Sequence, residues 1–482
     1  MSLLRRRAAE LARRVPSFSR APSSSFSRAS SSSTVDVATE AEVKADSLLP
    51  MEQEGDAVGF AQTRLTWKPR PSSQRVAVET SQLFCASNDP LEQTAEDAGR
   101  FFQLDGSTNA FDVFYHNGYC GENVASRNAH LKTSAMMVRR EGLRLRDDLL
   151  NLDSNSNLAD AAGWILAGEK GVGKSMVLNY ILAAMQRAGW LVAVVPHAAD
   201  WTLGLSARSA QAANEAYRVT DPSYFNQVPP ELEGSSTHEN PEASAHFLMS
   251  FYLSQRDKLA TIPIKDEERR AHYASAAADP KVGPTLADML GTVARDSYQA
   301  FADFPMPARP VHDLLRELQS VTEYPTLIVV DGWNRWSQMA TSCHWRTKRP
   351  LHASDLMVPA MLGGDLSYGK NMARGVMLGA TTHNGAQPPG VPMRLRKHIP
   401  PPPDFQRKLH ALRREDRFRG RIREVAAYSA SETQAMLEFY ALCGHMHNPL
   451  LGTQLRTGEL ARKVRLMTAG NGEDLYQIAH QM

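Results

Sequence analysis

The sequence predicts an α/β fold built on a parallel β-sheet, because several apolar runs along the chain have the character of buried strands. Residues 164–167 lead into a glycine-rich loop and then into residues 176–188, whose apolar side chains recur at helical spacing. Residues 191–196 and 326–331 are two more continuous apolar runs, as expected of strands covered on both faces. Residues 375–382 are predicted to be a further core strand.

The glycine-rich loop at residues 168–175 has the pattern G-x-x-x-x-G-K-[ST] of a phosphate-binding loop, or P-loop. A strand before it and a helix after it are the context that this loop requires, which argues against a chance glycine turn. Its backbone N–H groups and the helix N-terminus would face a phosphate. Lys174 is expected to reach the β- and γ-phosphates, and the Ser175 hydroxyl to ligate Mg²⁺. The predicted nucleotide-binding residues are Gly168, Glu169, Lys170, Gly171, Val172, Gly173, Lys174 and Ser175. The fold class is therefore a P-loop NTPase, with a parallel sheet of the additional-strand (AAA/STAND-like) type.

Asp331, at the end of the run 326–331, is the second chemical landmark. A P-loop protein places the carboxylate that positions Mg²⁺ at the end of such a strand, so Asp331 is predicted to be a metal ligand together with Ser175. Hydrolysing members of the additional-strand class commonly have an acid next, whereas Gly332 follows here and Asn334 comes two residues later. We therefore expect hydrolysis to be slow or absent, and the nucleotide to be a structural ligand.

Thr381 and Thr382 end the last predicted core strand. Their hydroxyls are placed to sense a γ-phosphate, and Thr381 is included among the predicted nucleotide-binding residues. An ordinary strand that happens to end in threonine explains them equally well.

The overall composition narrows the classes of function. With 42% hydrophobic residues in 482, the chain can bury a sizeable core, and its net charge of +2 means that any basic surface must be local. The four cysteines are far apart and lack a C-x-x-C pair, so they form neither a zinc site nor a disulfide framework. No apolar run reaches the roughly 18 residues of a membrane-spanning helix.

Residues 1–34 are predicted to be a mitochondrial transit peptide. Seven arginines face one acid, Glu10, and a serine-rich tract follows. Such a segment, amphipathic and poor in acids, is typical of an organelle address. A chloroplast address and a disordered basic tail are the alternatives.

The rest of the chain is expected to have four parts. Residues 35–130 are an N-terminal extension, disordered in part, and residues 131–389 are the P-loop NTPase core with a large helical insertion at about 202–325. Residues 390–422 are a loop rich in proline and arginine, which fits binding to a phosphate backbone and a plain solvated loop equally well. Residues 423–482 are a last strand and a small helical C-terminal lid.

One helix is predicted over residues 135–152, with Met136 and Met137 facing inward. Arg139 and Arg146 are expected to face outward on its arginine-rich side. Such a side is usually only solvated, and contact with RNA is the less favoured interpretation.

The sequence also resembles the death-associated protein family, the P-loop GTP-binding proteins of the small subunit of the mitochondrial ribosome. The resemblance covers roughly residues 130–482, and the order and spacing of its pieces are more specific than any one of them. The pieces include MVR at 137–139, GEKGVGKS at 168–175, GWL at 189–191, PHA at 196–198, GPTL at 283–286, LREL at 315–318, VDGWN at 330–334 and AGN at 469–471.

This resemblance implies a structural constituent of the small subunit that supports mitochondrial translation and contacts rRNA and neighbouring ribosomal proteins near the subunit interface, facing the large subunit. It also implies bound GTP or GDP with Mg²⁺. The chain lacks an N-K-x-D element, so guanine rests on the resemblance alone and ATP stays open. At most a weak GTPase is expected. The alternative function is a free mitochondrial signalling-type P-loop NTPase that hydrolyses ATP or GTP.

Overall fold

The structure is a computed structural model, and it describes the chain in separate ranges. They are residues 80–104, 122–131, 133–154, 163–199, 201, 226–227, 238–299, 308–337, 339–343, 350–363, 372–382, 422–446 and 451–482. The predicted transit peptide lies outside them, as does the basic loop at 390–422 except for Ile422.

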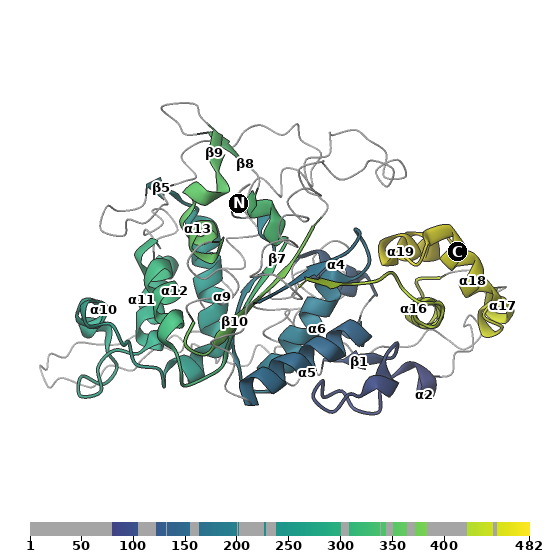
Figure 1. Ribbon diagram of the computed structural model, residues 1–482, viewed down its shortest axis with the longest axis horizontal. Coiled ribbons are helices and arrows are strands. Elements are labelled where there is room, and N and C mark those ends of the chain that lie inside the picture. Colours follow the sequence, from purple (N-terminus) through teal and green to yellow (C-terminus); the bar gives the residue numbers. More distant parts are fainter. Residues whose placement is uncertain are drawn as a thin grey trace, which may run out of the picture.

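Among the described residues, five strands form one parallel sheet, in the order β11-β3-β10-β7-β4 (Figure 1). The strands are β3 (Trp164–Ala167), β4 (Leu191–Val195), β7 (Thr326–Asp331), β10 (Gly375–Ala380) and β11 (Ile422–Glu424). Strand β10 lies between β3 and β7 and pairs with β7 over its whole length. The mixed α/β fold with a parallel sheet is thus confirmed, and each predicted core strand is present.

The two faces of the sheet bury alternate residues of the same strands, as the two-residue period of a strand requires. Val192 of β4 and Val329 of β7 point into one hydrophobic cluster, on the face covered by α5 (Arg140–Ser154) and α6 (Lys174–Arg187). Ala193 and Ile328 point into the opposite cluster. That face is covered by helices from the predicted insertion and from the segment after β7: α9 (Pro241–Leu259), α11 (Leu286–Gln299), α12 (Ala308–Ser320) and α13 (Met357–Gly363).

Shorter elements complete these layers. They are α2 (Thr80–Leu83), α4 (Glu122–Leu131), α10 (Glu267–His272) and the two-stranded pairs β5 (Asn226–Gln227) with β6 (His238–Glu239) and β8 (Met339–Cys343) with β9 (Pro350–His352). Each helix in the described part of the chain is too short or too polar to cross a membrane.

The prediction of a single helix over 135–152 is wrong at its start. Residues 135–137 are strand β2 (Ala135–Met137), which pairs antiparallel with β1 (Phe101–Gln103), and helix α5 begins only at Arg140. Met136 points into the cluster beneath α6, whereas Met137 points into a third cluster. Two adjacent methionines are therefore buried on opposite sides of a strand, which the sequence alone could not distinguish from one face of a helix.

The third cluster joins β1 and β2 to the C-terminal helices α16 (Ala430–Cys443), α17 (Gly452–Arg456), α18 (Glu459–Thr468) and α19 (Gly472–Gln481). Helix α16 begins with a capping box, in which Ser429 and Glu432 satisfy each other's backbone N–H groups, and it ends at Gly444 in the left-handed conformation. In Figure 1 these helices lie beside α2 and β1, at the opposite end of the molecule from α10–α12.

Candidate functional site

The loop at residues 168–175, the predicted P-loop and called so below, connects β3 to α6 and owes its shape to three glycines with positive φ. Gly168, Gly171 and Gly173 have φ of 144°, 85° and 95°. A Cβ on Gly168 would lie 2.6 Å from the Val425 carbonyl oxygen, and one on Gly171 would overlap the Asn471 side chain. Only glycine fits at these two positions, so the loop backbone is fixed by both its conformation and its neighbours.

The Lys174 side chain is folded back onto this loop. It is 7% exposed, and its ammonium donates hydrogen bonds to the carbonyls of Gly168 (2.9 Å) and Glu169 (2.6 Å). Burial lowers the pKa of Lys174 to about 8, opposed by the nearby charges of Asp331 and Glu169. The ammonium is therefore held where an anion in the loop would meet it.

The other predicted loop residues differ in exposure. Val172 is buried against the sheet, whereas Glu169 and Lys170 are exposed. The Ser175 hydroxyl, in the first turn of α6, hydrogen-bonds to Asp331 at the end of β7. Burial raises the pKa of Asp331, while Ser175, His197 and Lys174 oppose that rise. A hydroxyl and a carboxylate in contact beside a lysine fit the oxygen ligands that Mg²⁺ prefers.

The residues after Asp331 link the ends of strands β7 and β10 through hydrogen bonds. Gly332 turns the chain with φ of 79° and donates its N–H to the Ala380 carbonyl. The Asn334 amide then donates to the Thr382 carbonyl and accepts from the Thr382 N–H, both at 2.7 Å. This asparagine holds the end of β10 to the end of β7. Thr381 lines the same site, but its hydroxyl donates to the Leu166 carbonyl at 3.2 Å.

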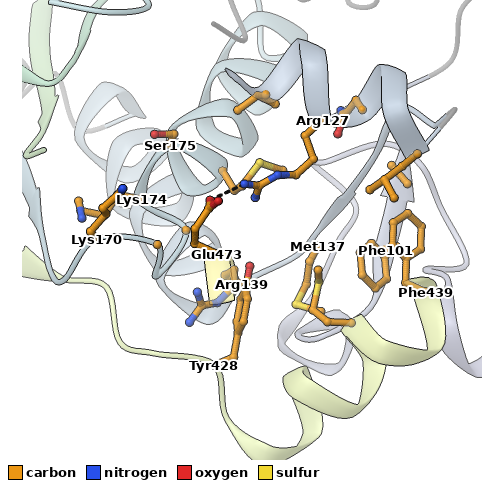
Figure 2. Close-up of a pocket in the computed structure, with 18 of the residues that line it drawn as sticks. Phe101, Arg127, Met137, Arg139, Lys170, Lys174, Ser175, Tyr428, Phe439 and Glu473 are labelled. Carbon is orange, nitrogen blue, oxygen red and sulfur yellow. Dashed lines mark hydrogen bonds and ion pairs between the residues drawn. The ribbon is translucent and has the colours of Figure 1, made fainter. Parts of the chain in front are cut away.

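A pocket runs from the P-loop into an apolar end formed by distant parts of the chain (Figure 2). At the P-loop end its lining residues include Lys170, Gly171, Gly173, Lys174, Ser175, Asp331 and Thr381. At the apolar end they include Phe101 of β1, Val124 and Leu131 of α4, Met137 of β2, and Met436 and Phe439 of α16. The rings of Phe101 and Phe439 stack at a centroid distance of 4.1 Å. The pocket thus has one polar end and one apolar end.

Arg139 lies between these two ends and was predicted wrongly to face solvent. It is 3% exposed. Its guanidinium donates to Glu432 (2.8 Å), to the Val172 carbonyl (2.8 Å) and to the Ala426 carbonyl (2.9 Å), and it lies over the Tyr428 ring. Arg146 is buried too, with bonds to the carbonyls of residues 90 and 93. Nothing in the local sequence separates these arginines from their exposed neighbours, because their partners are distant in the chain.

The C-terminal helices close the site from the other side. The Gly472 N–H donates to the Gly171 carbonyl at 2.9 Å, and the Asn471 amide donates to the Lys170 carbonyl. In α19, Glu473 pairs with Arg127 of α4 at 2.5 Å, across the middle of the pocket (Figure 2). The turn after α18 therefore contacts the P-loop directly. In the turn after α18, the sequence offered one signal, the AGN piece at 469–471, and that piece did not indicate a contact with the P-loop.

A family model described as mitochondrial ribosomal death-associated protein 3 matches residues 136–228 and 231–477, more than half of the chain. The matched ranges begin in β2 and end in α19, so they include the P-loop, Asp331 and the C-terminal turn. A search of curated proteins found no match.

Proposed function

The chain belongs to the mitochondrial ribosomal death-associated protein 3 family, and on this premise we propose that it binds a guanine nucleotide with Mg²⁺ as a structural ligand. Membership makes it a mitochondrial protein of the small ribosomal subunit. The nucleotide, the metal and the way in which they stabilise the fold are our proposal.

The P-loop and its surroundings carry this proposal. A lysine ammonium rests on the loop carbonyls beside a contacting hydroxyl and carboxylate, which is the arrangement that phosphate with Mg²⁺ requires. The strand order adds support, because β10 separates the loop strand β3 from the Asp331 strand β7 as in additional-strand P-loop NTPases. We propose Lys174 and the loop N–H groups for the phosphates, and Ser175 with Asp331 for Mg²⁺.

The apolar end of the pocket is our proposed place for the base. Phosphate at the loop directs the rest of a nucleotide past Arg127 and Glu473 toward Met137 and Phe439. Apolar and aromatic walls stabilise a flat base by burying its faces. The choice of guanine over adenine is drawn from the family alone.

Asn334 supports a structural role for the nucleotide rather than its hydrolysis. Hydrolysis needs a group that orients water next to the phosphate, and this side chain is instead engaged in two bonds to the Thr382 backbone. We therefore propose weak GTPase activity at most. Bound nucleotide would instead hold the P-loop, α4 and the C-terminal helices in one arrangement.

Contacts with rRNA and neighbouring ribosomal proteins complete the proposal. The basic loop at 390–422, which lies outside the described residues except for Ile422, is our proposed rRNA contact because of its arginine density. Contacts across the subunit interface are proposed from the family alone.

The test is sedimentation of the tagged protein from lysed mitochondria through a sucrose gradient, with and without Mg²⁺. Wild type should travel with small-subunit rRNA and release a guanine nucleotide when denatured. Lys174→Ala should lower the incorporated fraction. Lys170→Ala removes an exposed side chain but keeps the loop N–H that we propose for the phosphates, so it should not. Protein near the top of the gradient that turns over nucleotide at about 1 per second or faster would instead favour the free NTPase.

A further inference from the structure

We propose that His130, His445 and His480 bind a divalent transition-metal ion, Zn²⁺ in the cell, at a site distinct from the proposed Mg²⁺ site. Imidazole nitrogen is a ligand that suits zinc, copper and nickel, whereas Mg²⁺ prefers oxygen. The three side chains come from three separate segments of the chain. His130 is near the end of α4, His445 follows α16, and His480 is in the last turn of α19.

The ring nitrogens are close enough to share one ion. One ligand atom from each histidine lies within 4.8 Å of the other two. Tetrahedral zinc, with Zn–N bonds of about 2.0–2.1 Å, places its nitrogen ligands roughly 3.4 Å apart. The nitrogens therefore have to approach one another by about 1.4 Å at most, roughly what rotation about the broad ring torsions supplies. His130 and His480 are exposed, while His445 is 4% exposed.

His445 is positioned like a zinc-binding histidine whose second ring nitrogen is held by a hydrogen bond to a neighbouring group. Its Nε2 lies 3.0 Å from the Tyr476 carbonyl oxygen. A carbonyl accepts, so Nε2 carries the proton and the lone pair is on Nδ1. Metal-binding histidines commonly use one ring nitrogen in this way, which fixes the tautomer and the ring orientation. The Tyr440 and Tyr476 rings, at centroid distances of 5.3 Å and 4.3 Å, pack against the imidazole.

The charges near the cluster are compatible with a cation. Arg127 lies over the Tyr476 ring at 4.6 Å, and it is ion-paired with Glu473 at 2.5 Å. The pair largely cancels the repulsion that an isolated guanidinium would exert on a metal ion. Three neutral imidazoles leave the ion's charge uncompensated, and water can complete its coordination on the exposed side.

An ion at this position would join α4 to the C-terminal helices. The same helix α4 supplies Arg127 and Asn128 to the pocket beside the P-loop, and α19 supplies Glu473. Zinc would thus hold the pocket wall formed by these two helices, whether or not a nucleotide is bound. The site does not depend on the proposed function.

The experiment is a titration of the purified full-length protein, stripped of metal by a chelator, with ZnCl₂ and separately with CoCl₂. We expect one ion per chain, a higher unfolding temperature with zinc, and the visible absorption of four-coordinate Co²⁺. His130→Gln and His480→Gln should each weaken zinc binding at least about tenfold. Both residues are exposed, so these variants keep the buried His445 and the surrounding core intact.

Two controls separate this site from other binding. His272→Gln, an exposed histidine on α10, should bind zinc as wild type does. Lys174→Ala should also retain zinc, so a failed nucleotide site would leave the result unaffected. Wild-type affinity in both cluster variants, or no stoichiometric ion in wild type, would overturn the proposal.

Discussion

The two ends of the pocket are built in opposite ways. The P-loop end is mainly one continuous stretch, residues 168–175, held by backbone hydrogen bonds and by glycines at positive φ. The apolar end is assembled from β1, α4, β2 and α16, and its side chains other than Val124 belong to the third hydrophobic cluster. Changes at the P-loop end should therefore act first on ligand affinity, whereas changes at the apolar end should act first on stability.

Lys174→Ala should produce the largest effect, and it should fall mainly on binding. Loss of charge-assisted bonds to phosphate is expected to cost about 4 kcal/mol, or roughly 1000-fold in nucleotide affinity. Burial disfavours the charged form of Lys174 in the fold, which offsets its two hydrogen bonds to the loop carbonyls, so the nucleotide-free protein should lose little stability. Calorimetric titration with GTP and urea unfolding without it measure the two quantities.

Lys170→Ala is the matched control, because it removes a lysine from the exposed part of the same loop. It should change nucleotide affinity less than about threefold. A marked loss of stability in nucleotide-free Lys174→Ala would mean that the P-loop end also supports the fold, and the contrast between the two ends would fail.

The sequence predicts the P-loop end better than the apolar end, because the first is a continuous stretch and the second is assembled from distant segments. The P-loop, Ser175 and the Asp331 strand are recognisable from a local motif and from apolar runs, and the sheet confirms those runs as strands. The contacts of Arg139 and Glu473 join segments about 290 to 350 positions apart, which no local pattern encodes. Residues 135–137 show this too, because β1 alone makes them a strand.

Arg139→Met sharpens the comparison because Arg139 contacts both ends. The change leaves the Glu432 carboxylate without its nearest charged partner, and the carbonyls of Val172 and Ala426 lose a donor. Breaking such a buried pair should lower the unfolding free energy by about 3–4 kcal/mol. Urea unfolding checks this value. Arg140→Met, the exposed neighbour at the start of α5, should change it by less than about 0.5 kcal/mol, and equal effects would contradict the role of Arg139.

Phe439→Ala tests the apolar end by itself. The ring is 3% exposed and stacks on Phe101, so its removal should lower the unfolding free energy by about 3 kcal/mol. Leu466→Ala, at a side chain 84% exposed on α18, should cost less than about 0.5 kcal/mol. Thermal unfolding of both variants without nucleotide gives the comparison. An unchanged midpoint for Phe439→Ala would mean that this end does not support the fold, and the contrast between the two ends would fail.

Gly470→Ala should have the smallest effect, and it tests the turn that joins the two ends. Gly470 has φ of 73°, and a Cβ there would overlap the Tyr428 carbonyl oxygen. Gly189 has a similar φ of 85°, but a Cβ on it would meet nothing within 4 Å. Gly189→Ala should therefore lower the unfolding free energy by about 1 kcal/mol, because only the left-handed backbone is strained. Gly470→Ala should lower it by about 2 kcal/mol, because the steric overlap adds to that strain. Urea unfolding of the pair isolates the steric share of the turn. Equal unfolding free energies for the two variants would mean that the C-terminal turn can shift to accept the added Cβ. Its contacts with the P-loop would then not couple the two ends.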